Sequence, residues 1–305
     1  MVKLIAAVAL LPLLLIAPAG VLAQTFAVEK RDAVQYGIHD GIALIGDLYL
    51  PQVAADRPAV IAVHGGGWQA GSRAIYQYMA PYLAARGYAV FAIDYRLTRD
   101  GKNRFPAAVH DLRASVQWVR SHAVELKIDP ARIALMGDSA GAHLAALSGL
   151  AGDSPEFADG YKDDPYAGVS TKVKAVVGVY GVYDMIAQWE HDQLARPGDN
   201  IGENFIGFPP ARDRRAWYAA PPVAHAVFAN NSTAFLLAFG TTDDIVDVPS
   251  QSQAFMMALK QARFFVRTVT VASAPHFWMA DPVEEPGGFP GFLTPRLLRF
   301  FAEKL

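Results

Sequence analysis

The chain contains no cysteine and few charged residues. Asp, Glu, Lys and Arg together make up 18% of its 305 residues. The lack of cysteine excludes disulfides, cysteine metal ligands and a cysteine nucleophile. The formal net charge of −2 gives no excess of cations for binding nucleic acid, so we expect no such partner. Without disulfides, stability must come from the core, and 52% hydrophobic residues are sufficient for a large one.

Long apolar stretches are also lacking, except at the N-terminus. There, Lys3 precedes an apolar run from Leu4 to Ala17, and Val21-Leu22-Ala23 supplies residues suited to a cleavage site. This pattern predicts a secretory signal peptide over residues 1–23 and a secreted or periplasmic protein. An N-terminal membrane anchor is the alternative. The run contains Pro12 and is shorter than the ~20 residues that span a bilayer, so we expect no stable anchor.

The remaining residues, 24–305, read as a single domain of the α/β class. Short apolar runs alternate with helical patterns, which favours a mostly parallel sheet flanked by helices. The pattern predicts eight strands: Val34–Ile38, Ile42–Leu50, Ala59–Val63, Tyr88–Ile93, Arg132–Met136, Lys174–Tyr180, Ala234–Phe239 and Phe265–Val271. Residues 183–225 follow the sixth strand and are rich in Pro, Gly, Trp and charge, which predicts a small cap-like insertion.

The strongest chemical signal is the pentapeptide Gly137-Asp138-Ser139-Ala140-Gly141. It matches G-x-S-x-G and lies between a predicted strand and a helix predicted over Ala140–Leu150. In that context the serine stands on a strained turn with its hydroxyl above the sheet, and small neighbours let strand and helix approach closely. We therefore expect Ser139 to be a nucleophile. The neighbouring Asp138 cannot orient a base from this position, and we expect it to be structural.

A glycine run follows the third predicted strand. His64-Gly65-Gly66-Gly67-Trp68 can turn main-chain N–H groups toward a developing oxyanion, and Ala140 can supply a further N–H from the serine turn. We expect His64 to hold this loop rather than to act as a base. Trp68 adjoins the loop and is our first candidate for a substrate-binding pocket wall, ahead of Trp189, Trp217 and Trp278.

A serine nucleophile needs a base, and the base needs an orienting carboxylate. Of eight histidines, His276 is the only one after the seventh predicted strand, and it follows the eighth. Chain order therefore selects His276 as the base. For the acid, Asp243 directly follows the turn Gly240-Thr241-Thr242, with Asp244 and Asp247 as alternatives.

These motifs resemble those of the α/β-hydrolases close to hormone-sensitive lipase, and of the neighbouring carboxylesterases and feruloyl and acetyl-xylan esterases. The resemblance covers nearly all of residues 24–305 and includes His64–Trp68, Asp94-Tyr95-Arg96-Leu97, Gly137–Gly141 and Gly240–Asp243. It implies that Gly66 and Gly67, together with Ala140, form the oxyanion hole, and that short acyl chains are preferred. The base loop Pro275-His276-Phe277-Trp278 departs from the family's usual Gly-His pattern and leaves the acyl and alcohol pockets undefined.

The sequence thus predicts a serine carboxylesterase that acts on a small-molecule ester and needs no metal or organic cofactor. An amidase or peptidase such as an arylformamidase uses the same fold and residues, and is the main alternative. A non-catalytic binding module of the same fold is a further alternative, although such modules usually lose one of the three residues that are present here.

Overall fold

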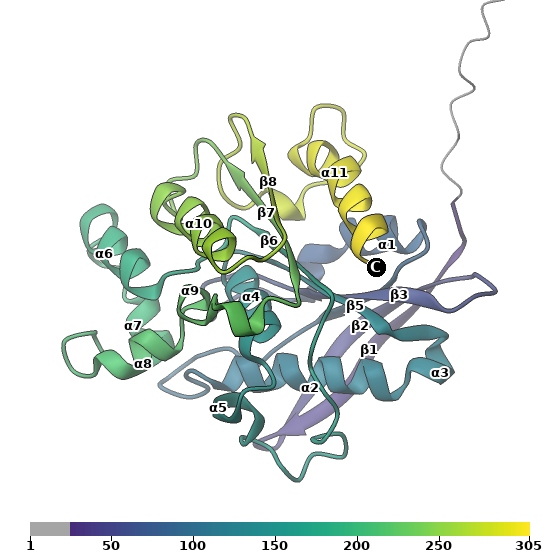
Figure 1. Cartoon of the computed structure of the whole chain (residues 1–305), viewed down its shortest axis with the longest axis horizontal. Coiled ribbons are helices and arrows are strands. Elements are labelled where there is room, and N and C mark those ends of the chain that lie inside the picture. Colours follow the sequence, from purple (N-terminus) through teal and green to yellow (C-terminus); the bar gives the residue numbers. More distant parts are fainter. Residues whose placement is uncertain (1–24) are drawn as a thin grey trace, which may run out of the picture.

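Eight strands form one mixed sheet through the middle of the molecule (Figure 1). The computed structural model describes residues 25–305, so the predicted signal peptide lies outside the described residues. Export stays a prediction, and the N-terminal residue of the mature protein would test it. The strands are β1 (Val28–His39), β2 (Ile42–Pro51), β3 (Arg57–Val63), β4 (Ala89–Ile93), β5 (Ile128–Asp138), β6 (Ala175–Val179), β7 (Ala234–Gly240) and β8 (Val266–Val271).

The strand order is β1-β2-β4-β3-β5-β6-β7-β8. The first two strands form an antiparallel hairpin and β2 is antiparallel to β4, whereas every other pair is parallel. The chain therefore has the expected α/β-hydrolase architecture, with the carboxyl ends of β3 and β5 to β8 at one edge. Ligand sites in parallel sheets of this kind form at that edge.

Helices cover both faces of the sheet. They are α1 (Met79–Ala84), α2 (Ala107–Ser121), α3 (Ala123–Leu126), α4 (Ala140–Ala151), α5 (Pro155–Ala158), α6 (Met185–Ala195), α7 (Ile201–Ile206), α8 (Arg214–Ala219), α9 (Pro222–His225), α10 (Ala254–Gln261) and α11 (Phe289–Lys304). One core contains residues of α2, α4 and α10, and a second core on the other face contains residues of α1 and α11.

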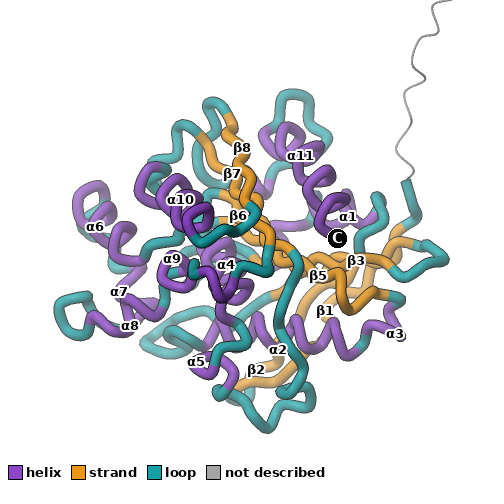
Figure 2. Tube along the Cα trace, viewed as in Figure 1, coloured by secondary structure: helices purple, strands orange, loops and turns teal. Residues whose placement is uncertain are grey.

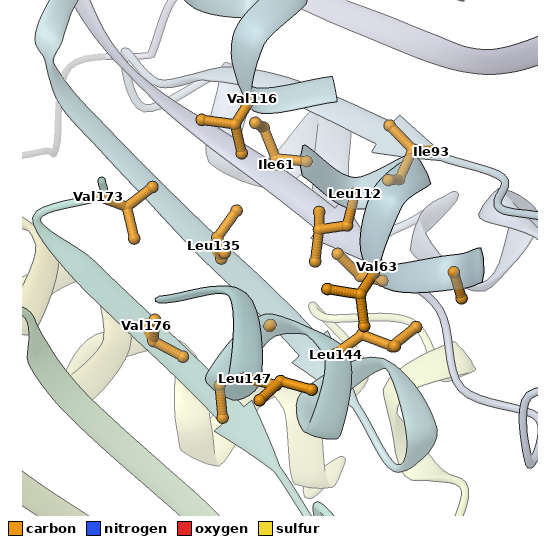
Figure 3. Close-up of a cluster of buried hydrophobic side chains, with 14 of the residues drawn as sticks. Ile61, Val63, Ile93, Leu112, Val116, Leu135, Leu144, Leu147, Val173 and Val176 are labelled. Atoms are coloured by element: carbon orange, nitrogen blue, oxygen red, sulfur yellow. The ribbon is translucent and has the colours of Figure 1, made fainter. Parts of the chain in front are cut away.

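Alternation along the strands explains the two cores. In β3, Ile61 and Val63 belong to the core with α2 and α4, whereas Val60 and Ala62 face the core with α1 and α11. Figure 3 shows Ile61 and Val63 among side chains of both helices, including Leu112 and Leu144. Because both faces are buried, the strand reads as a continuous apolar run.

The segment predicted as an insertion lies between β6 and β7 and contains the helices α6 to α9. In Figure 2 these helices lie to one side of the central strands. Within residues 25–305, no helix combines the length and apolarity needed to cross a membrane.

Candidate active site

Ser139 lies on a sharp turn between β5 and α4. Its backbone has φ 51° and ψ −120°, a conformation that is strained for a residue with a Cβ. The turn is fixed on both sides, because the Ser139 N–H donates to Val179 O at 2.9 Å and the His143 N–H donates to Ser139 O at 3.1 Å. The strain is therefore supported by the neighbouring strand and by the first turn of α4.

Glycines on either side of the serine allow this turn to pack. A Cβ on Gly137 would overlap the carbonyl of Gly141, and a Cβ on Gly141 would overlap the carbonyl of Val63. The helix α4 therefore approaches β3 and β5 more closely than a side chain at position 137 or 141 would permit. This is the steric reason for both glycines of the G-x-S-x-G pattern.

Ser139, His276 and Asp243 form a hydrogen-bonded chain at the carboxyl edge of the sheet. His276 Nε2 lies 3.0 Å from Ser139 Oγ, and His276 Nδ1 lies 2.8 Å from Asp243 Oδ2. The side chains of His276 and Asp243 are 2% and 0% exposed. A hydroxyl, an imidazole and a buried carboxylate in this order can serve as nucleophile, base and orienting acid.

The acid loop after β7 distinguishes Asp243 from its two competitors. Asp243 Oδ1 accepts the N–H groups of Ile245 and Val246, both at 3.0 Å, which orients its second oxygen toward His276. Asp244 is exposed. Asp247 instead accepts hydrogen bonds from the N–H and hydroxyl of Ser250. Within the described residues, only Asp243 forms a hydrogen bond with His276 Nδ1.

The glycine loop after β3 lies beside Ser139. Gly66 and Gly67 have φ values of 109° and 57°, which glycine adopts readily. Both residues line one cavity together with Ser139, Ala140 and His276. Within residues 25–305, the N–H groups of Gly66 and Gly67 donate no hydrogen bond.

His64 and Asp138 support this loop. His64 Nδ1 bonds Gly65 O at 2.7 Å, and its ring stacks on Tyr95. Burial lowers the pKa of His64, which favours a neutral structural ring. Asp138 Oδ1 accepts the N–H of Gly65 and the hydroxyl of Tyr76, both at 3.1 Å. Burial raises the pKa of Asp138 to about 7. His64 therefore holds the loop and Asp138 has a structural role, as expected from the sequence, and the structure adds that Asp138 bonds the same loop.

The cavity that Ser139 faces has a volume of about 440 Å³. Of the four tryptophans considered as wall residues, Trp68 lines it and Trp189, Trp217 and Trp278 do not. Trp68 is buried, stacks on Phe205 and donates through Nε1 to His143 at 3.2 Å. It is thus a packed aromatic and a pocket wall at once.

Among the pocket residues that sequence reasoning missed are two groups. Phe277 follows the base, is 63% exposed and has φ 69°. Gln188, Asp192 and Arg196 also line the cavity, from α6 and the residue after it. Their spacing of four residues puts them on one face of a helix, which is the signal that could have found them.

Comparison with known proteins places the chain in a family. The model of the family described as BD-FAE matches residues 46–259. The chain belongs to the BD-FAE family. Among curated proteins, this BD-FAE member is 32% identical to esterase LipC of Mycobacterium tuberculosis over 86% of its own length and 60% of LipC. It is also 28% identical to the probable carboxylic ester hydrolase LipM of the same organism, over 67% of this chain and 45% of LipM. The chain therefore spans only about half the length of these relatives.

Solved structures agree with this placement. The thermophilic esterase Est2 of the planctomycete Thermogutta terrifontis superposes with a TM-score of 0.69 and 25% identity, over 88% of this chain and 90% of Est2. Est2 has also been solved phosphorylated by paraoxon, and with propionate or butyrate bound. The BD-FAE chain therefore has the fold of an esterase over nearly its whole described length.

Proposed function

We propose that this protein is a serine carboxylesterase that hydrolyses esters of short acyl chains through an acyl-enzyme. The observation that carries the proposal is the hydrogen-bonded chain Ser139–His276–Asp243 beside a cavity. The esterase names of LipC and Est2 support it, as does the phosphorylation of Est2 by paraoxon.

In the proposed mechanism, His276 Nε2 takes the proton of Ser139 Oγ as that oxygen attacks the ester carbonyl. Asp243 holds the imidazole and stabilises its charged form. The N–H groups of Gly66, Gly67 and Ala140 bind the oxyanion, each donor being worth roughly 3–4 kcal/mol of barrier. His276 then protonates the leaving alcohol. Water, deprotonated by the same imidazole, releases the acid and regenerates Ser139.

The preference for short acyl chains is the finer part of the proposal. Est2 binds propionate and butyrate in its solved complexes. In this chain, the buried Trp68 ring is fixed between Phe205 and His143 and cannot move aside readily for a long chain. We infer that the acyl site ends near this wall.

The test is hydrolysis of p-nitrophenyl esters from acetate to laurate by the wild type and by Ser139→Ala. We expect the highest kcat/KM for the shorter esters. The variant should lose roughly 10⁴-fold or more, because removing the nucleophile removes the covalent path. The matched p-nitroanilide should react far more slowly than the ester. Equal activity of the two proteins would contradict the role of Ser139, and faster anilide cleavage would favour an amidase.

A further inference from the structure

A cluster of three polar side chains forms one wall of the Ser139 cavity. Gln188, Asp192 and Arg196 are spaced by four residues along α6 and its C-terminal end, and all three line the cavity. The side chain of Asp192 is only 6% exposed. A carboxylate buried this deeply beside a mostly apolar cavity is costly to dehydrate, so its hydrogen bonds need to be accounted for.

The donors of the cluster are already used within the protein. Gln188 Nε2 donates to Asp192 Oδ1 at 2.8 Å and to Ile245 O at 2.9 Å. Arg196 bonds Asp192 Oδ1 and the carbonyl oxygens of Asp244 and Ile245, the last two at 3.2 and 3.1 Å. The cluster is therefore fixed against the loop that carries Asp243, and Asp192 is held by one of its two oxygens.

The acceptors of the cluster are not satisfied. Asp192 Oδ2 accepts no hydrogen bond from the described residues. Gln188 Oε1 also accepts no hydrogen bond from these residues, but this atom is fully buried. Asp192 Oδ2, in contrast, keeps some solvent-accessible surface. Burial raises the pKa of Asp192 despite the adjacent Arg196 and Gln188. The carboxylate is thus incompletely solvated and can accept a further donor.

We propose that Asp192 determines substrate specificity by accepting, through Oδ2, a hydrogen bond from a hydroxyl group on the acyl or alcohol part of the ester. A neutral donor fits best, because Arg196 already balances the charge of Asp192, and a substrate anion would be repelled by the carboxylate. This inference rests on the proposed esterase function and adds a preference for esters that carry a hydroxyl group.

The test uses pairs of esters in which a hydroxyl is replaced by a methoxy group, which accepts but cannot donate. One pair is 3-hydroxypropyl and 3-methoxypropyl butyrate, and the other is methyl 3-hydroxybutyrate and methyl 3-methoxybutyrate. For the wild type, we expect kcat/KM to favour the hydroxyl ester roughly tenfold or more in at least one pair, since an acceptor rejects a group that cannot donate to it. In Asp192→Asn, the amide oxygen can still accept the hydrogen bonds from Arg196 and Gln188, and the NH₂ group then takes the place of Oδ2. The preference should then fall to about one or reverse.

Glu190→Gln is the matched control, because it removes the same charge from an exposed position of α6. It should keep the wild-type ratio. Labelling of Asp192→Asn by a fluorophosphonate reports whether its Ser139 site is intact. A structural role of Asp192 would lower both members of a pair equally and leave their ratio unchanged.

The result that overturns the subsite is a wild-type ratio of about one or less in both pairs, a measurement that depends on no variant. An unchanged ratio in labelled Asp192→Asn would overturn it too. Hydrolysis of the plain p-nitrophenyl esters would continue in either case, so the esterase function would stand. Failure of the wild type on every ester would overturn the function and the subsite together.

Discussion

His143 illustrates how a single buried residue makes this fold sensitive to acid. Its Nδ1 accepts the indole N–H of Trp68 at 3.2 Å, which leaves the proton on Nε2 to donate to Ala220 O at 3.0 Å. Burial lowers the pKa of His143 to about 4. A second proton on the ring would have to face the Trp68 N–H, so the folded state favours the neutral ring.

This pKa predicts a loss of stability on acidification. Between pH 6.5 and 4, the unfolded chain binds a proton at His143 that the folded protein does not, so the free energy of unfolding falls as pH falls. The loss is about 1.4 kcal/mol per pH unit, or roughly 3 kcal/mol in all. Asp138 acts in the opposite direction, because its pKa raised to about 7 makes the folded state bind the extra proton.

A variant separates the two effects. We expect the stability difference between wild type and His143→Gln to shrink by about 2.5 kcal/mol between pH 7.5 and pH 4.5, since only the wild type has a histidine at this position to protonate in the unfolded state. Urea unfolding at the two pH values measures it. A difference that stays constant with pH would show that His143 does not remain neutral in the folded protein.

Residue types and chain order were sufficient to predict Ser139, His276 and Asp243 as partners, and the structure places them within hydrogen-bond distance. The sequence could not decide fully between Asp243 and its neighbours Asp244 and Asp247. That choice depends on which side chain the acid loop turns inward, and the loop is set by the N–H groups that Asp243 Oδ1 accepts.

At the scale of elements, the contact of α4 with the sheet depends on Gly141. A Cβ there would overlap the carbonyl of Val63, a backbone atom that cannot move without displacing β3. We predict that Gly141→Ala lowers the free energy of unfolding by about 3 kcal/mol, at the upper end of overpacking costs. Gly198→Ala is the control, because nothing lies within 4 Å of its Cβ position.

Urea or thermal unfolding of both variants tests this packing. Gly198→Ala should stay within about 0.5 kcal/mol of the wild type, as surface changes usually do. Equal stability of Gly141→Ala and wild type would mean that α4 can move away from β3. Such a result would also weaken the steric explanation of the G-x-S-x-G glycines.

Strands and the helices next to the sheet were predictable because their periodicity is strong. The predicted strands Ala59–Val63 and Ala234–Phe239 lie within β3 and β7. For the insertion, the sequence predicted the segment 183–225 but not the helices within it. Its helices α6 to α9 are short and are stabilised by tertiary contacts, such as those of Gln188 and Arg196 with the acid loop. Contacts of this kind join residues far apart in sequence and leave little local pattern.

For the whole molecule, the sheet and the insertion act together on one site. Loops after β3, β5, β7 and β8 supply the glycine N–H groups, Ser139, Asp243 and His276, and α6 closes the cavity around them. The central claim is that this assembly makes Ser139 a nucleophile. An unactivated serine on the surface would not react with an organophosphate.

The most direct measurement is therefore the reaction with paraoxon, followed by p-nitrophenol release and peptide mass spectrometry. We predict one p-nitrophenol per protein molecule in the initial phase and a single diethylphosphoryl group on the peptide that contains Ser139. Ser139→Ala should release none and carry no label. Labelling of another residue, or equal labelling of Ser139→Ala, would contradict the assignment of Ser139 and with it the proposed mechanism.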